Sequence, residues 1–476
     1  MSERLASRTL RNSVLVVGAR AVAKLGVFVV VVLLLRHLGD ESYGRFAAMV
    51  VYVTLLGVVA DLGLQTVFIR DVSRDRRLLA RYLANLLNAR LLLAVAALVL
   101  LAAILRVASP QLFPYTLAAF VLLLTTSYSS LLRAVFYIRG RLIYEAIAII
   151  GEAIVLLMLV VVAIQRNASW DAFLWVYSAS YLFTCLFAYI VLRWRWQEDI
   201  ALKLEPRLLR SLLGAGIPLA LGFTIVTIYA QVDVVLLQLF KGFRVVGWYS
   251  AANRFVDAVA WIPQSAMGAV FPALSMVSAG QRGHLAFAYE KSYKMLALLG
   301  LPLAVGIGVT APSLIHLAAP SGFDPAIPAL QILAPSIVLL FVNNAFIYTL
   351  TAMNRQLDFT RLCLVTLAVN LVLNLALIPL YGYLGAAVAS TLTELALLVG
   401  GWWLLRGQGL SLSLIRGIAP LIASATAMGV VVYVFRSWPL VIVVVMAAAV
   451  YATGLIVLRA LNAEEWSILR SGLTAR

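Results

Sequence analysis

Long apolar stretches alternate with short polar segments along almost the whole chain. A membrane-spanning helix needs about 20 consecutive apolar residues, and a window of that length predicts fourteen such helices. The predicted spans lie at 12–36, 43–69, 80–105, 112–136, 143–165, 170–192, 207–240, 247–278, 287–318, 327–352, 360–379, 384–405, 413–435 and 439–460. The pattern therefore predicts an all-α polytopic membrane protein.

Composition and charge support this class. Of the 476 residues, 63% are hydrophobic and 12% are charged, whereas soluble domains carry about 25% charged residues. The net charge of +17 would suggest a nucleic-acid partner in a soluble protein. Most Lys and Arg residues instead fall in every second loop, at 4–11, 70–81, 133–141, 193–210, 282–294, 355–361, 406–416 and 459–476. Because cytoplasmic loops carry the excess of cations, we expect no nucleic-acid partner and a bacterial or archaeal cytoplasmic-membrane protein with both termini in the cytoplasm.

An internal repeat divides the chain. Residues 33–48 align without a gap with residues 236–251. The identical positions of the first copy are Leu33, Leu34, Gly39, Gly44 and Ala48. Six predicted spans separate the copies, so both halves share one orientation, as in transporters built from parallel repeats. We expect two pseudo-symmetric six-helix lobes at 1–198 and 199–408, followed by a two-span tail at 409–476.

Three blocks of sequence resemble a known family. They are LRHLGDESYGRFAAMVVYVTLLGVVADLGLQTVFIRDVSRD at 35–75, VDVVLLQLFKGFRVVGWYSAANRF at 232–255 with FPALS at 271–275, and NLVLNLALIPLYGYLGAAVASTLTE at 370–394. These blocks resemble the Wzx-type polysaccharide flippases of the MOP superfamily. The resemblance implies that a polyprenyl-pyrophosphate-linked oligosaccharide is moved from the cytoplasmic to the outer leaflet by alternating access. A multidrug or toxin extruder of the same superfamily is the alternative.

Charged residues inside the predicted spans point to an anionic cargo. A charge in hydrocarbon is costly unless it is paired or faces water, so it marks a candidate functional site. Arg20 and Lys24 lie one helical turn apart in the first span. At 1.5 Å per residue, Arg20, Asp61 and Arg90 all lie about 13 Å from the cytoplasmic boundary, and Lys24 lies about 6 Å deeper.

The deep cations admit two interpretations. In the first they are paired with acids on neighbouring spans, since pairing lowers the cost of burying a charge. The pairs would be Asp61 with Arg20 or Arg90, Glu152 with Lys24, and Asp233 or Asp257 with Arg254. In the second they bind pyrophosphate, because the first lobe holds more deep cations than deep acids. The candidate pyrophosphate ligands are then Lys24, Arg90, Arg20 and Arg254.

The resemblance adds weight to Lys24. In lipid II flippases a cation on the first helix precedes a Leu-Gly step and lines the central cavity, and Lys24, Leu25 and Gly26 match that pattern. A second arginine of that family would fall near Val30, so the chain departs from the pattern there. We therefore expect Lys24 to be the main cargo contact, with Arg90 as its nearest support.

A second polar cluster resembles a coupling-ion site. With the carbonyl group of Ala386, it resembles the sodium site of lipid II flippases and comprises Asp233, Asn370, Asn374 and Ser390. Oxygen ligands suit small hard cations, but Asn374 replaces a carboxylate of that site. Ordinary hydrogen bonding between helices is the alternative. Coupling to a sodium ion, to a proton or to the membrane potential stays open, and we expect no other metal or cofactor.

The remaining features favour transport over catalysis. The predicted loops are short, whereas a membrane glycan polymerase or ligase needs a long outer loop or a carboxylate pair for acid–base work. We therefore expect a non-enzymatic transporter that functions as a monomer. Its expected partners are the lipid-linked oligosaccharide and the membrane lipids.

Overall fold

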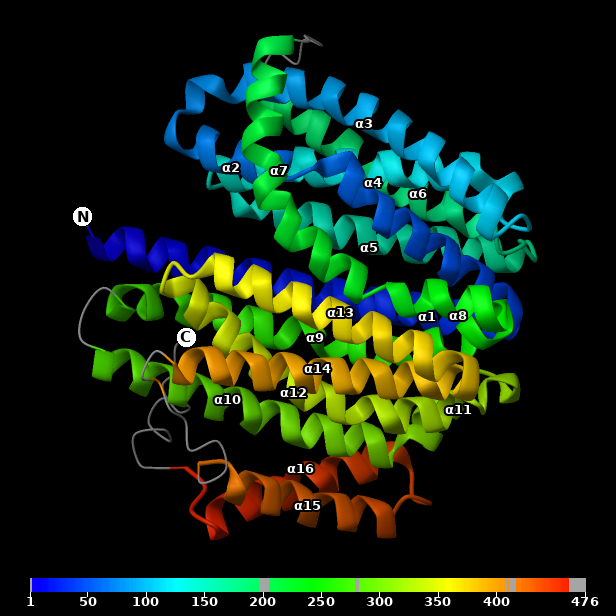
Figure 1. The fold of residues 1–476 in the computed structure, drawn as a ribbon, viewed down its shortest axis with the longest axis vertical. Coiled ribbons are helices and arrows are strands. Elements are labelled where there is room, and N and C mark those ends of the chain that lie inside the picture. The colour runs from blue at the N-terminus through cyan, green and yellow to red at the C-terminus, as the bar shows by residue number, and fades with distance from the viewer. Residues whose placement is uncertain (1, 197–204, 279–281, 408–409, 411–416, 462–476) are drawn as a thin grey trace. The chain divides into compact units, whose positions relative to one another are not determined.

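The structure is a computed structural model that describes residues 2–196, 205–278, 282–407, 410 and 417–461. All regular elements in these ranges are helical (Figure 1). The helices are α1 (Ser2–Asp61), α2 (Leu64–Arg74), α3 (Leu79–Ala108), α4 (Thr116–Ile138), α5 (Leu142–Gln165), α6 (Ala172–Ile190), α7 (Pro206–Tyr229), α8 (Val232–Lys241), α9 (Phe243–Ser278), α10 (Arg282–Val309), α11 (Ala311–Ala318), α12 (Ala326–Ala352), α13 (Gln356–Tyr381), α14 (Tyr383–Arg406), α15 (Ala419–Val434) and α16 (Leu440–Val457).

Within the described residues, eleven helical segments are long and apolar enough to cross a membrane. This confirms the predicted all-α polytopic membrane fold. The eleven differ from the fourteen predicted spans because α1 contains the first two spans, which meet at the non-helical Gly39, and because α15 has 16 residues. In addition, α9, which occupies the eighth predicted span, is not one of the eleven.

Several predicted spans are interrupted where the backbone leaves helical geometry. Gly39 is non-helical inside α1, and α1 ends at Asp61 because Leu62 and Gly63 adopt positive φ. The predicted span 43–69 therefore continues as the separate helix α2, and span 207–240 is divided into α7 and α8. Span 287–318 is divided into α10 and α11, with Pro312 in the first turn of α11. Proline is favoured there because the first N–H groups of a helix have no helical partner.

The chain forms two compact units, unit 1 (residues 1–250) and unit 2 (residues 251–476). The predicted lobe boundaries at 198/199 and 408/409 lie outside the described residues, so the division into those lobes stays a prediction. In unit 1, α5 packs against α1 and α6, and α4 packs against α3 and α6 (Figure 1). α7 contacts α1, α2 and α3, and it therefore belongs to this unit.

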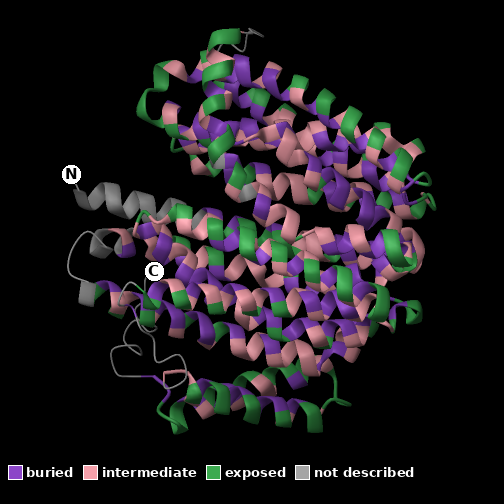
Figure 2. Cartoon of the chain, in the orientation of Figure 1, coloured by how far each residue is buried: buried purple, intermediate pink, exposed green. Residues whose placement is uncertain are grey.

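In unit 2, α12 is the central helix. It contacts α10 and α14, while α13 packs on α14 and α15 pairs with α16. The most apolar stretch of α12 is 56% buried, whereas that of α16 is 17% buried. α16 therefore presents apolar side chains outward (Figure 2), as expected of a helix that faces lipid.

Two turns of unit 1 form what we call the glycine clasp, residues 39–44 and 242–247. These turns are the two copies of the internal repeat. Each begins with a glycine in a conformation that other residues adopt only with strain, since φ is 71° at Gly39 and 82° at Gly242. The positive φ explains why both copies have a glycine at the first position of the turn.

The last glycine of each turn packs directly against the backbone of the other turn. A Cβ atom on Gly44 would lie 1.8 Å from the carbonyl oxygen of Phe243, and one on Gly247 would lie 2.0 Å from that of Asp40. In the repeat alignment Gly247 corresponds to Gly44, and Phe243 corresponds to Asp40. The two contacts therefore exchange with each other, as at a two-fold interface. An internal duplication predicts this reciprocity.

Side chains reinforce the glycine clasp. Trp248 Nε1 donates to Asp40 Oδ2 over 3.1 Å. Deeper in unit 1, the hydroxyl groups of Tyr52 and Ser109 both donate to Gln238 Oε1, over 2.8 and 2.7 Å. Buried polar groups are costly when unpaired, so these bonds make the contact between α1 and α8 specific.

We expect Gly44→Ala to destabilise the protein by about 1–3 kcal/mol, because overpacking forces the backbone of the partner turn to shift. Thermal unfolding of the purified protein in detergent measures the effect. Gly18→Ala is the matched control in the same helix, since a Cβ atom there meets nothing within 4 Å. Equal unfolding temperatures for the two variants would contradict the close contact.

Candidate functional site

Arg90 on α3 is the centre of a polar cluster in unit 1. Its side chain is 1% exposed. The guanidinium donates to Asp61 Oδ1 and, over 3.2 Å, to Gln65 Oε1. It also donates to the carbonyl oxygen of Ser127 and, over 3.0 Å, to Ser130 Oγ. These partners belong to α1, α2 and α4, so one arginine connects four helices.

Asp61 and Gln65 lie in the wall of a cavity of about 370 Å³ within unit 1. Its lining comes from α1, α2, α7 and the turn after α1, and comprises Thr54, Gly57, Val58, Asp61, Gly63, Gln65, Thr66, Ile69, Ala220 and Thr227. The Asp61 side chain is 34% exposed, while Arg90 lies behind it. The cavity therefore presents a carboxylate and several hydroxyl groups, and Arg90 reaches a ligand there only when Asp61 moves aside.

A second polar network begins at Arg20 on α1. Arg20 donates to the Tyr137 hydroxyl over 2.6 Å, and this hydroxyl donates to Glu145 Oε1 over 3.3 Å. Arg133 Nε lies 3.9 Å from the same carboxylate oxygen. Arg20 thus contacts a tyrosine of α4, whereas Asp61 contacts Arg90.

Glu152 on α5 completes this network. It accepts a hydrogen bond of 2.6 Å from Thr184, and its Oε2 lies 3.7 Å from Arg133. The expected pair with Lys24 is therefore replaced by a pair with Arg133. The sequence placed Arg133 at the cytoplasmic boundary, but its position on α4 faces the acids of α5.

Sequence reasoning missed Arg133, Tyr137 and Glu145. A signal was present, because Arg133 and Tyr137 are four residues apart on α4, and Glu145 and Glu152 are seven apart on α5. Both spacings place side chains on one helix face. With these residues included, helices α1 to α6 hold the cations Arg20, Lys24, Arg90 and Arg133 against the acids Asp61, Glu145 and Glu152. Unit 1 also contains the buried carboxylate of Asp233 on α8, so over the whole unit the four cations are matched by four acids.

Lys24, like Arg20, is exposed on α1, but it differs from the other deep cations in its contacts. Within the described ranges, no acid lies in ion-pair distance of its ammonium group. Arg254 in unit 2 is different again, since it lies 3.2 Å from Asp257 on the same helix, α9. The binding roles of these cations stay predictions.

The residues of the predicted ion site are divided between the two units. In unit 1, buried Asp233 accepts hydrogen bonds from the Tyr249 hydroxyl and from the backbone N–H of Val234. In unit 2, Asn370 Nδ2 donates to Thr393 Oγ1 over 3.0 Å. Asn374, which lies one helical turn after Asn370, donates to Asn370 and not to α14.

Asn374 is fully buried on α13, and its Nδ2 donates to both oxygens of Asn370 over 2.9 and 3.1 Å. Its Oδ1 accepts no hydrogen bond from the described residues. Ala386 is buried and Ser390 is half-buried on the neighbouring helix α14. Unit 2 therefore contains a buried carbonyl oxygen with free acceptor capacity, on a residue that is hydrogen-bonded to Asn370 of the predicted site.

The fold and these contacts can now be compared with known proteins. The family described as Polysaccharide biosynthesis protein matches residues 9–278. The chain belongs to this family. A Haloferax volcanii protein named "Probable low-salt glycan biosynthesis flippase Agl15" is 28% identical over 166 residues, which cover 35% of each chain. The chain spans 35–49% of the length of the curated relatives that it matches.

Solved structures agree on the fold. The lipid II flippase MurJ in an inward closed conformation superposes with a TM-score of 0.74 at 13% identity, covering 94% of this chain and 99% of that one. An inward-facing multidrug resistance MATE family transporter of the MOP superfamily superposes with a TM-score of 0.67 at 17% identity, covering 82% and 95%. This fold and the family membership confirm the resemblance to MOP-superfamily polysaccharide flippases.

We expect Asp61→Ala to destabilise the protein by about 3–5 kcal/mol, because it leaves the buried guanidinium of Arg90 without a carboxylate partner. Asp257→Ala is the control, since exposed ion pairs contribute about 0–1 kcal/mol. Thermal unfolding in detergent compares the two. The double variant Asp61→Ala/Arg90→Met should unfold at a higher temperature than Asp61→Ala alone, and the reverse order would contradict the pairing.

Proposed function

We propose that this chain is a flippase that moves a polyprenyl-pyrophosphate-linked oligosaccharide from the cytoplasmic to the outer leaflet. Family membership and the MOP fold support a transporter of the flippase class. The distribution of Lys and Arg supports an orientation with both termini in the cytoplasm. Alternating access is the proposed mode of transport.

The exposed side chain of Lys24 is the observation that carries the choice of cargo. A pyrophosphate group is best bound by a cation that has no competing carboxylate, and in the described part of the chain Lys24 has none within ion-pair distance. Arg90 and Arg20 already donate to Asp61 and Tyr137. Lysine binds phosphate as a point charge, so we assign Lys24 the first contact, and Arg90 becomes available if the cargo displaces Asp61.

A drug extruder is the second candidate, and one observation favours it. The carboxylate of Asp61 is the charged group exposed in the wall of the unit 1 cavity. A carboxylate there suits a cationic drug better than a pyrophosphate. Drug resistance that is lost in Asp61→Asn, together with an unchanged surface glycan, would favour the extruder.

In a cell whose surface glycan depends on this protein, Lys24→Ala should reduce glycan display about 10- to 100-fold. This corresponds to the loss of one charge-assisted hydrogen bond of about 1.5–3 kcal/mol. Lys24→Arg keeps the charge and should retain most of the display. Leu25→Ala is the neighbouring control, because Leu25 is an uncharged residue that is 68% exposed. Normal display in Lys24→Ala and in Arg90→Ala would refute the proposed cargo site.

We also propose that transport is coupled to an ion. The free acceptor capacity of Asn374 Oδ1 and the buried carboxylate of Asp233 support a sodium ion or a proton as the coupling ion. In vesicles, wild-type transport should then depend on a sodium or a proton gradient, and Asp233→Asn should lose that dependence. Equal transport by Asp233→Asn and wild type under every gradient would exclude coupling through this residue, and leave the membrane potential as the driving force.

A further inference from the structure

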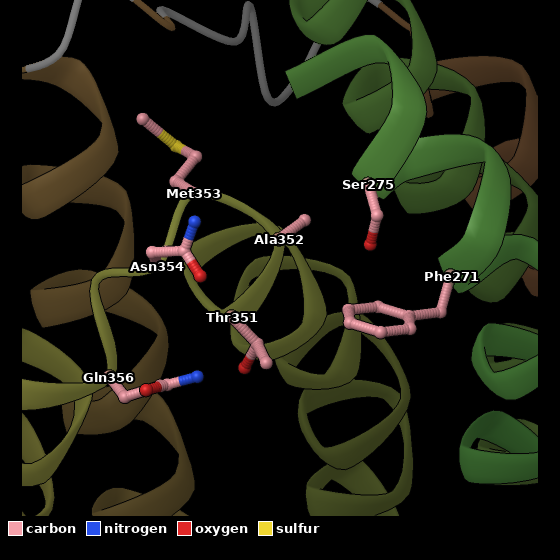
Figure 3. A pocket seen from close by; sticks show the side chains of 7 residues that line it. All are labelled: Phe271, Ser275, Thr351, Ala352, Met353, Asn354 and Gln356. Carbon is pink, nitrogen blue, oxygen red and sulfur yellow. The ribbon is translucent and has the colours of Figure 1, made fainter. Parts of the chain in front are cut away.

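A second cavity, of about 330 Å³, lies within unit 2 (Figure 3). It lies between the C-terminal part of α9 and the turn that joins α12 to α13. Phe271 and Ser275 extend from α9, and Figure 3 shows them facing Thr351 and the amides of Asn354 and Gln356 across the cavity. Its volume is at the lower end of the range for small-ligand pockets, about 300–1,000 Å³.

The chemistry of the lining selects a neutral ligand with hydroxyl groups. None of the residues that line the cavity is titratable. The side-chain amides of Asn354 and Gln356 each offer donors and an acceptor, and the hydroxyl of a ligand can use both. The Thr351 hydroxyl donates to the carbonyl oxygen of Ile347 over 2.8 Å, so it faces other partners as an acceptor.

The α9 wall carries the Phe271 ring beside the Ser275 hydroxyl, and a neighbouring ring fixes the orientation of Phe271. The ring of Phe271 meets the ring of Tyr348 edge to face, with centroids 5.7 Å apart and an interplanar angle of 73°. This arrangement is a favourable one for aromatic pairs and orients the Phe271 ring. A ligand with hydroxyl groups at its rim and a C–H face, such as a sugar ring, matches the two walls.

The charges beside the cavity are engaged with one another. Arg355 Nε lies 2.5 Å from Asp358 Oδ2, and Arg361 lies 3.6 Å from the other oxygen of that carboxylate. The carboxylate of Asp358, just after the turn, is therefore paired with both arginines. A neutral ligand needs no displacement of these pairs.

We propose that this cavity binds a neutral sugar unit of the glycan that the protein transports. The proposal rests on the proposed function, because the cargo supplies the sugar. The turn at 353–355 and its cations lie in a loop that the positive-inside pattern assigns to the cytoplasm, where the glycan would be selected before transport. Specificity for the glycan thus resides in unit 2, while the cation for the pyrophosphate lies in unit 1.

The test uses the full-length protein in lipid nanodiscs with galactose and N-acetylglucosamine as probes and glycerol as the control for hydroxyl groups without a ring. Saturation-transfer NMR should detect binding of at least one of the two sugars and none of glycerol. Gln356→Ala and Phe271→Ala should each weaken sugar binding about tenfold, the effect of losing roughly 1.4 kcal/mol. Leu357→Ala is the matched control, because Leu357 is 75% exposed beside Gln356 and does not line the cavity.

Absence of binding by both sugars, or equal binding by wild type and Gln356→Ala, would overturn the proposal. Gln356 is exposed, so that variant keeps the test valid if Phe271→Ala does not fold. A second arm measures surface glycan in cells that carry Gln356→Ala. Reduced display supports the lipid-linked glycan as the source, and normal display with weakened sugar binding overturns that link in favour of a free sugar. Failure of the proposed cargo site is seen separately, as normal display in both Lys24→Ala and Arg90→Ala.

Discussion

The cost of placing a charge in hydrocarbon governs the arrangement of unit 1. Arg90 has no route to water in its 1% exposed position, so helices must bring oxygen atoms to it. Those oxygens belong to residues on three other helices, and the break between α1 and α2 lies directly beside Asp61. The interrupted helix, the cavity wall and the packing of α3 on its neighbours thus share one electrostatic cause.

The same constraint separates the deep cations by role. Arg90 and Arg133 are tied to carboxylates, and Arg20 is tied to a tyrosine that contacts a carboxylate. Lys24 lies on the helix that carries Arg20, and among the described residues no acid is within ion-pair distance of its ammonium group. Lys24 is therefore the deep cation of α1 to α6 that has neither an acid nor a tyrosine partner within the described residues. The uncharged sugar-sized cavity of unit 2 complements it.

The class of fold could be predicted because the mean hydropathy of about 20 consecutive residues identifies a membrane-spanning helix without any knowledge of tertiary contacts. The sequence placed Asp61 and Arg90 at one depth, and the structure joins them. It failed for Glu152, since depth along a helix says nothing about rotation around it, and the choice between Lys24 and Arg133 as partner depends on rotation. The helix break after Asp61 was not predicted either, although Gly63 with its positive φ lies in it; positive φ at Leu62, by contrast, is not expected from its residue type.

The glycine clasp has an evolutionary consequence. Each copy of the turn spaces its two glycines five residues apart, and each copy is the steric complement of the other. An insertion or deletion in one turn would move its last glycine out of register with a carbonyl group that has not moved. Length changes in the two copies therefore need to occur together.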